Sequence, residues 1–252
     1  MVFKRIIKRK LKMKSVIRLI ALCVSLASAS AALSEPLFHE KRYPKGDGPF
    51  PAVILLHTSG GFSTVLKQLR PYTQRGYAAY APDFFTRHKI TKASRFDTWT
   101  KYRRDIEEEL IEIVELMKKD PKVDKNNIFA AGFSNGGYWA TFLAAQNHVN
   151  AGASHYGVWK WPSWNGYPVN YFSRDSHPVL ALHGEKETVQ KMVNVRDQLS
   201  AAEYKSPKFK KVIFPNVGHS WDCTGCRKDG YNAEITQKAL DLTIEFFEQN
   251  KK

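Results

Sequence analysis

Residues 128–137 read Ile-Phe-Ala-Ala-Gly-Phe-Ser-Asn-Gly-Gly, and this stretch decides the fold. Its apolar first half predicts a buried strand, and residues 137–145, rich in small and apolar side chains, predict a buried helix. Between the two, Gly132, Ser134 and Gly136 form a Gly-x-Ser-x-Gly pattern. This pattern predicts a turn so sharp that side chains beside the serine would clash. Such a turn leaves the Ser134 hydroxyl exposed at its tip, as a nucleophile requires.

A serine nucleophile needs a histidine that takes its proton and a carboxylate that orients the histidine. In strand-turn-helix arrangements of this kind, the acid and then the histidine follow the serine along the chain. The strand predicted at residues 178–183 leads into Glu187, and the strand predicted at 211–215 leads into His219. Open parallel sheets place their chemistry beyond the carboxyl ends of their strands. We therefore predict that Ser134, Glu187 and His219 form a catalytic triad.

The chain has eight histidines, and most need no functional role. His57, His155 and His183 lie in or at the end of apolar runs, which predicts hydrogen-bonded core positions. His219 is the one that lies on a glycine-led loop after the last predicted strand, beyond both the serine and the acid. This position favours His219 as the general base.

More than one carboxylate could orient the histidine. Glu187 is favoured because it lies just beyond a predicted parallel strand. Glu185, two residues earlier, is its rival, and Asp222 is a third candidate.

A triad of this kind also needs an oxyanion hole, made by the amide after the nucleophile and by a second amide from the loop after an early strand. Asn135 follows the serine and supplies the first amide. The strand predicted at residues 51–57 runs into a loop with two adjacent glycines, which let the backbone turn inward. Within that loop Ser59 is the favoured second donor, and Thr58 is the alternative.

The predicted strands alternate with helical patterns. Two apolar stripes recur every three or four residues and predict core-facing helices, the first with Asp97 as its cap. The stripes are Trp99, Tyr102, Ile106, Leu110, Ile113 and Met117, and Ile235, Ala239, Leu242 and Phe246. The alternation predicts an α/β fold in one domain over residues 32–252, with a mainly parallel sheet covered on both faces.

Residues 51–247 resemble the dienelactone hydrolase family of the α/β-hydrolase superfamily, because four segments occur in the family's order. The strand at residues 76–87 ends in Pro-Asp-Phe-Phe-Thr-Arg, similar to the family's Pro-Asp-Leu-Tyr-x-Arg. The other three are the turn at residues 132–137, Tyr156-Gly157 and Gly218-His219. The resemblance implies an α/β-hydrolase fold and a carboxylic ester hydrolase that needs no cofactor.

The chain also departs from this family. The nucleophile is Ser134 where dienelactone hydrolase has cysteine, and Thr58 takes the place of a glutamate on the oxyanion loop. Arg87 matches one of the two arginines that bind the substrate carboxylate, but the other position falls on Cys223. The acid is Glu187 where the family has aspartate. These differences favour a serine hydrolase of a small ester or lactone over a true dienelactonase.

Residues 156–177 are rich in aromatic side chains and show neither helical nor strand periodicity. Because this stretch follows a strand on the predicted catalytic side, Trp159 and Trp161 are predicted to wall the substrate pocket. The alternative is a loop packed on the body of the protein by its own aromatic residues.

The N-terminal residues predict export. Residues 13–31 contain the basic, apolar and small-residue regions of a secretory signal, so we expect residues 1–31 to be a signal peptide, with Met13 as an alternative start. Its apolar part is too short for a stable membrane anchor. The expected location is secreted or periplasmic.

Removal of residues 1–31 leaves 31 basic and 24 acidic residues, a formal net charge of +7. No nucleic-acid module accompanies this charge, so a small-molecule ester is the expected partner and nucleic acid is not. The sequence gives no indication of oligomeric state.

The mature chain retains Cys223 and Cys226, for which an oxidising compartment favours a disulfide. No further ligands indicate a metal site. Two other functions remain open: a binding protein that keeps the fold without turnover, and a thiol-disulfide protein that uses this cysteine pair.

Overall fold

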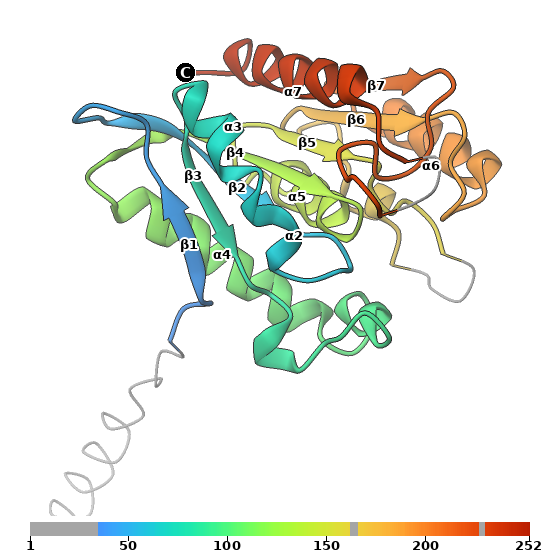
Figure 1. Cartoon of the computed structure of the whole chain (residues 1–252), viewed down its shortest axis with the longest axis horizontal. Coiled ribbons are helices and arrows are strands. Elements are labelled where there is room, and N and C mark those ends of the chain that lie inside the picture. Colours follow the sequence, from blue (N-terminus) through green and yellow to red (C-terminus); the bar gives the residue numbers. More distant parts are fainter. Residues whose placement is uncertain (1–34, 162–165, 227–229) are drawn as a thin grey trace, which may run out of the picture. The chain divides into compact units, whose positions relative to one another are not determined.

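The computed structural model describes residues 35–161, 166–226 and 230–252. Residues 36–252 form one compact unit, while the predicted signal peptide lies outside the described residues. The unit is built on a seven-stranded sheet with the strand order β1-β3-β2-β4-β5-β6-β7 (Figure 1). The β1 strand runs antiparallel to β3, and every other neighbouring pair is parallel. The mainly parallel α/β sheet predicted from the alternation of elements is confirmed.

The elements follow one another as predicted for such a fold. The strands are β1 (His39–Arg42), β2 (Phe50–Leu56), β3 (Ala78–Pro82), β4 (Val123–Phe133), β5 (Gly152–His155), β6 (Val179–Gly184) and β7 (Phe209–Phe214). The α-helices are α2 (Ser63–Leu66), α3 (Leu69–Gln74), α4 (Arg103–Lys119), α5 (Asn135–Ala145), α6 (Met192–Lys205) and α7 (Ala233–Glu248). Short 3₁₀ helices cover Thr86–His88, Arg95–Thr98 and Pro168–Tyr171.

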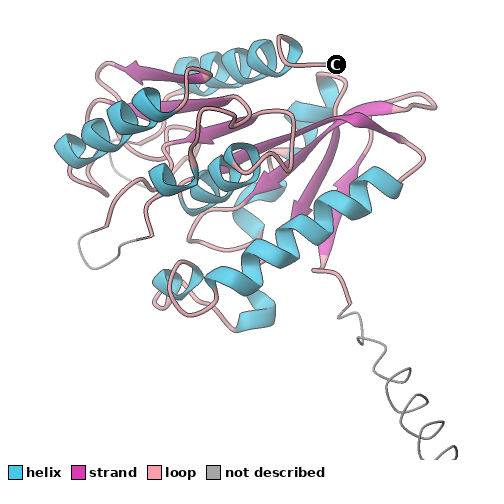
Figure 2. Ribbon diagram, turned by 180° about the vertical axis from the view of Figure 1, so that it is seen from behind, coloured by secondary structure: helices cyan, strands magenta, loops and turns pink. Residues whose placement is uncertain are grey.

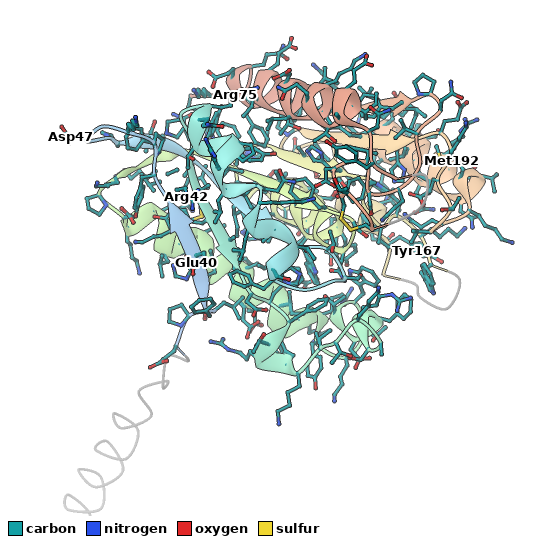
Figure 3. All side chains as sticks on the ribbon, viewed as in Figure 1. Glu40, Arg42, Asp47, Arg75, Tyr167 and Met192 are labelled. Atoms are coloured by element: carbon teal, nitrogen blue, oxygen red, sulfur yellow. A yellow bond between two sulfur atoms is a disulfide. The ribbon has the colours of Figure 1, made fainter. Side chains whose placement is uncertain are left out.

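The sheet buries both of its faces. Along β2, Ile54 belongs to the core shared with α4, α5 and α6, while the next residue, Leu55, belongs to the core shared with α2, α3 and α7. Successive strand side chains point to opposite faces, so an unbroken apolar strand needs helices on both sides. Figure 2 shows the long helix α4 crossing in front of the strands. On the other face, Arg75 at the end of α3, labelled in Figure 3, pairs with Asp241 of α7 over 2.6 Å.

The two predicted helical stripes lie on α4 and α7. In α4 the predicted core positions Ile106, Leu110, Ile113 and Met117 are all buried, which confirms the spacing argument. The prediction that Asp97 caps this helix is wrong. Asp97 lies in the 3₁₀ helix Arg95–Thr98, which ends before α4 begins. The N-cap residue of α4 is Tyr102, and its amide donates to the Asp97 carbonyl.

The strand that leads to the serine is longer than the apolar pattern predicts. The β4 strand begins at Val123, five residues before the expected start at Ile128, and includes the polar residues 124–127. Its pairing with β2 shifts in register between these points, because Phe50 pairs with Val123 and Ala52 pairs with Ile128. The polar residues therefore form an irregularity at the edge of the ladder. The polarity of residues 124–127 gives no sign that the strand extends back to Val123, which pairs with Phe50.

Candidate active site

Ser134 occupies the turn between β4 and α5, with φ of 53° and ψ of −108°. A positive φ is costly for a residue other than glycine, so neighbouring contacts must hold the turn. A Cβ on Gly132 would lie 1.9 Å from the Gly136 carbonyl oxygen, and a Cβ on Gly136 would lie 2.1 Å from the Leu56 carbonyl oxygen. Glycine is therefore required at both positions, because neighbouring backbone atoms leave no room for a Cβ.

His219 brings the serine and the acid together. Its Nε2 lies 2.9 Å from Ser134 Oγ, and its Nδ1 lies 2.7 Å from Glu187 Oε2. A carboxylate only accepts hydrogen bonds, so Nδ1 carries the proton and Nε2 is left to accept from the serine hydroxyl. All three side chains are buried. The arrangement can move a proton from the serine to the imidazole and stabilise the imidazolium that results.

Backbone amides fix the other oxygen of the acid. Val189 N donates to Glu187 Oε1 over 2.6 Å, and Gln190 N donates to the same atom over 3.3 Å. Burial by itself raises the pKa of this carboxyl, but the hydrogen bond and charge of His219, the charge of His183 and the Val189 amide outweigh burial, so the net pKa is lowered. Glu187 is thus held in its charged form.

The two alternative acids lie elsewhere. The Glu185 side chain is half exposed, and its carboxylate is 3.9 Å from Arg196. Asp222 accepts a hydrogen bond from the Tyr156 hydroxyl. Of the three carboxylates considered from the sequence, the structure places Glu187 against the imidazole.

A second histidine lies beside the acid, although its apolar surroundings in the sequence predict only a core position. His183 is fully buried, its Nε2 is 3.1 Å from Gly157 O, and its Nδ1 is 3.6 Å from Glu187 Oε2. Burial lowers its pKa, against the opposing charge of Glu187. Its place at the end of β6, four residues before Glu187, was the signal that it shares the acid's surroundings.

The two predicted oxyanion donors come from segments that contact each other. Asn135 Nδ2 donates to Ser59 Oγ over 3.5 Å. Asn135 is the first residue of α5, where backbone amides have no partner within the helix. The Thr58 amide donates to Thr64 Oγ1 over 3.2 Å and is therefore engaged, which favours Ser59 over Thr58 as the second donor.

The two tryptophans predicted to wall the pocket have different surroundings. Trp159 is fully buried, and its ring packs against Phe172 and Phe209. In this structure it is a core residue, because a side chain without accessible surface has no face open to a ligand. Trp161 is partly exposed and packs against Phe96, with 4.7 Å between ring centroids. Contact of Trp161 with a substrate stays a prediction.

Arg87, the predicted partner of a substrate carboxylate, interacts with a protein carboxylate. Its NH1 donates to Glu109 Oε1 over 2.9 Å, while the other oxygen of Glu109 lies 2.8 Å from His88 Nε2. The guanidinium remains partly exposed. Its contact with a substrate stays a prediction.

The loop that carries His219 is crosslinked. Cys223 and Cys226 form a disulfide, visible as a yellow bond in Figure 3. Cys223 N also donates to Ser220 O over 3.1 Å, and Trp221 O accepts from Asn232 N over 2.8 Å. The disulfide favoured from the sequence is present, close to the imidazole along the chain.

Neither a candidate metal cluster nor a candidate membrane span occurs within residues 35–161, 166–226 and 230–252. Among them, no three histidine, cysteine, aspartate or glutamate side chains are grouped so that they could hold a metal ion. None of the helices in these ranges combines the length and the apolar character that a membrane span needs.

Known proteins share both the sequence pattern and the fold. Residues 41–251 match the dienelactone hydrolase family. A Yersinia pestis protein provisionally described as a carboxymethylenebutenolidase is 23% identical over 216 residues, which cover 81% of this chain and 79% of that protein.

Solved structures support the fold assignment. A Klebsiella pneumoniae protein provisionally described as a dienelactone hydrolase has a TM-score of 0.72 and 22% identity, covering 84% of this chain and 92% of the other. An esterase of Thermogutta terrifontis with bound propionate has a TM-score of 0.65 and 18% identity, covering 86% and 91%. The matched family together with this fold shows that the chain belongs to the dienelactone hydrolase family of α/β-hydrolases and is a carboxylic ester hydrolase.

Proposed function

We propose that this protein is an exported serine hydrolase that cleaves a small carboxylic ester or lactone through an acyl-enzyme on Ser134. One observation carries the proposal: His219 lies within hydrogen-bond distance of both Ser134 Oγ, at 2.9 Å, and Glu187 Oε2, at 2.7 Å. A hydroxyl, an imidazole and a buried carboxylate in this order are the parts of a serine triad.

The reaction would proceed in two halves. His219 Nε2 takes the proton of Ser134 as Oγ attacks the ester carbonyl, and Glu187 stabilises the imidazolium. The amides of Ser59 and Asn135 donate to the oxyanion, and the imidazolium then protonates the leaving alkoxide. In the second half, His219 deprotonates a water that attacks the acyl carbonyl, and Ser134 recovers its proton.

Three features support a small ester or lactone as the substrate. The similar Thermogutta terrifontis esterase is described with propionate, a short carboxylate, bound. A serine nucleophile suits simple esters, and Cys223, which takes the place of the second carboxylate-binding arginine, is bonded to Cys226. Arg87 pairs with Glu109 over 2.9 Å, so a substrate carboxylate would have to share the guanidinium with a protein carboxylate.

The proposal of export rests on the signal-like pattern of residues 13–31 and is supported by the disulfide. The N-terminal residue of the protein recovered from the producing cell's exterior or periplasm tests it. Cleavage after Ala29 or after Ala31 would fit the small-x-small pattern of a signal peptide, so a start at residue 30 or 32 is expected. An uncut chain kept with the cytosolic fraction would contradict export.

The catalytic proposal is tested by the release of chromophore from a short-chain aryl ester and by covalent labelling with a fluorophosphonate. The unaltered protein should give a burst and one label per chain. Ser134→Ala should lower kcat by roughly three orders of magnitude or more and abolish the label. Ser206→Ala is the matched control, because it removes another buried hydroxyl at the end of α6 and should change neither readout.

The outcomes also separate the two alternative functions. A binding protein would release no chromophore and take no label, although it would keep the fold. A thiol-disulfide protein would lose its activity on substitution of Cys223 or Cys226 rather than Ser134. Either result would overturn the proposed mechanism.

A further inference from the structure

Tyr156 lies against the imidazole of the triad. Its ring centroid is 4.8 Å from that of His219, and the two planes are inclined by 60°. The backbone around Tyr156 also contacts the nucleophile on both sides, because Ser134 N donates to His155 O over 3.0 Å and Val158 N donates to Ser134 O over 3.1 Å. A displacement of Tyr156 would therefore change the positions of both reacting side chains.

The hydroxyl of Tyr156 is held by a carboxylate on the histidine's own loop. It donates to Asp222 Oδ1, and burial together with Asp222 raises its pKa far above the usual value, so the hydroxyl stays a donor. Asp222 lies three residues after His219. Tyr156 is therefore joined to the histidine loop at two points. Its hydroxyl donates to Asp222, and its ring contacts His219.

Asp222 is in turn fixed from outside the loop. Its Oδ2 accepts from Gln68 Nε2 over 2.6 Å and lies 3.1 Å from Lys67 Nζ, while Lys67 Nζ also donates to its backbone carbonyl. Lys67 and Gln68 lie between α2 and α3, in the segment that follows the predicted oxyanion loop. Asp222 thereby links the histidine loop to the part of the chain that carries Ser59.

Packing alone does not hold this carboxylate. A pocket of about 200 Å³ lies beside it, lined among others by Gln68, Tyr72, His155 and Trp221. Side chains next to open space lose the contacts that would otherwise restrain them. The position of Asp222 therefore depends on its polar partners.

We propose that Asp222 and Tyr156 are positioning residues that hold the His219 imidazole between Ser134 and Glu187. The inference rests on the proposed serine mechanism, and it adds to that mechanism a pair of residues that act through His219. A small displacement of a general base is costly, because proton transfer needs the donor and acceptor at hydrogen-bond distance. Loss of the pair should thus reduce kcat while leaving ground-state binding unchanged.

Two conservative substitutions separate the hydrogen bond from the ring contact. Tyr156→Phe keeps the ring on His219 and removes the hydroxyl. Asp222→Asn keeps the size of the side chain, but its single amide oxygen can serve either Tyr156 or the Gln68 and Lys67 donors. The matched control is Tyr77→Phe, because the Tyr77 hydroxyl also donates to a carboxylate, Glu248 Oε1 at 2.6 Å, on the helix α7.

The experiment measures kcat and KM on a short-chain aryl ester, and the thermal midpoint, for the three single variants and for Tyr156→Phe with Asp222→Asn. We expect each site variant to lower kcat about tenfold with KM unchanged, and the double variant to lose no more than either single one. Tyr77→Phe should lower the thermal midpoint without lowering kcat. An unchanged kcat in Tyr156→Phe, multiplicative losses in the double variant, or an equal kcat loss in Tyr77→Phe would overturn the proposal.

A second readout does not depend on turnover. The Nδ1 proton that His219 donates to Glu187 should give a downfield proton resonance, sharp in the unaltered protein and in Tyr77→Phe but broadened in Tyr156→Phe. If that resonance is equally sharp in Tyr156→Phe, the positioning role is wrong. If the resonance behaves as expected while Ser134→Ala keeps its turnover, the proposed function is wrong and the positioning of His219 stands.

Discussion

Two histidine–carboxylate pairs in this molecule look alike at short range and differ in what surrounds them. His219 lies 2.7 Å from Glu187, and His88 lies 2.8 Å from Glu109; both carboxylates are buried. Glu109 also receives a hydrogen bond from Arg87, which gives it a permanent cation. The other close donors to Glu187 are neutral backbone amides. No permanent cation among them balances its negative charge, which therefore acts on the imidazole of His219.

The second difference is on the far side of each histidine. The remaining nitrogen of His219 meets the hydroxyl of Ser134, which the sharp turn after β4 presents. The ring of His88 instead packs on Tyr102, with 4.6 Å between centroids. A histidine on a buried carboxylate is thus a stabilising contact in one place and the proposed general base in the other, and the serine on the turn makes the difference.

The largest expected effect is that of removing the charge of the triad acid. Glu187→Gln should lower kcat by about 10³–10⁴-fold, because the amide neither sets the right tautomer of His219 nor stabilises its charged form. Glu109→Gln should leave kcat within about twofold and lower the thermal midpoint, since it removes the buried negative charge that pairs with Arg87. Ester kinetics and thermal melts of the two variants test the comparison directly.

Glu185→Gln is the control within the same loop. Its side chain is half exposed and loosely paired, so neither kcat nor the midpoint should change appreciably. A loss of turnover in Glu185→Gln as large as that in Glu187→Gln would mean that the acid is misassigned.

A smaller loss is expected when the acid is shortened. Glu187→Asp keeps the charge but removes a methylene, and the carboxylate cannot then reach both the Val189 amide and His219 Nδ1 as it does now. We expect kcat to fall about 10–100-fold with little change in KM. Steady-state kinetics decide this, and activity equal to the unaltered enzyme would show that the longer side chain is not required.

Histidines without a carboxylate hydrogen bond extend the comparison to stability. His57 donates to Thr58 O, and His155 is 3.0 Å from Thr243 Oγ1. Burial lowers the pKa of each from 6.5 to about 4. The unfolded chain therefore takes up protons first, so stability present above pH 6.5 should be lost as the pH falls toward 4, by roughly 1 kcal/mol per pH unit for each histidine.

Urea unfolding between pH 7 and pH 5 measures that loss, before most carboxylates titrate. His155→Gln should reduce the slope of unfolding free energy against pH, because one of the buried imidazoles with a lowered pKa no longer contributes. An identical slope in this variant would show that His155 is not a source of the pH dependence.

The smallest effect is expected from the disulfide. Cys223 and Cys226 close a short ring beside Asp222, so reduction should loosen the histidine loop rather than unfold the domain. Turnover should fall a few-fold at temperatures well below the melting midpoint, on the scale of a slightly misplaced base. The double variant Cys223→Ser with Cys226→Ser should show the same loss and no further response to reductant, whereas full activity in it would separate the disulfide from the positioning of His219.

Local patterns predicted the parts of the site whose reasons are local. The glycines around Ser134 follow from backbone contacts that leave no room for a Cβ, and the stripe on α4 follows from its core-facing spacing. The strand β1 was not predicted, because a short polar strand at the sheet edge has no apolar signal of its own. The aromatic stretch around Trp159 suits both a pocket wall and a core, so its sequence cannot separate the two, and burial places Trp159 in the core.

The sequence by itself determined the family-like order of strand, turn and helix, and the residue types that a hydrolase needs, because periodicity and close-packed glycines act over a few residues. Tertiary structure alone decided which of the candidate carboxylates meets His219, and that Asp222 reaches Tyr156. Those contacts join residues from different strand ends, and their distances depend on how the sheet brings loops together. No spacing along the chain encodes such a distance, so the pairing of the acid, the base and their supports had to come from the fold.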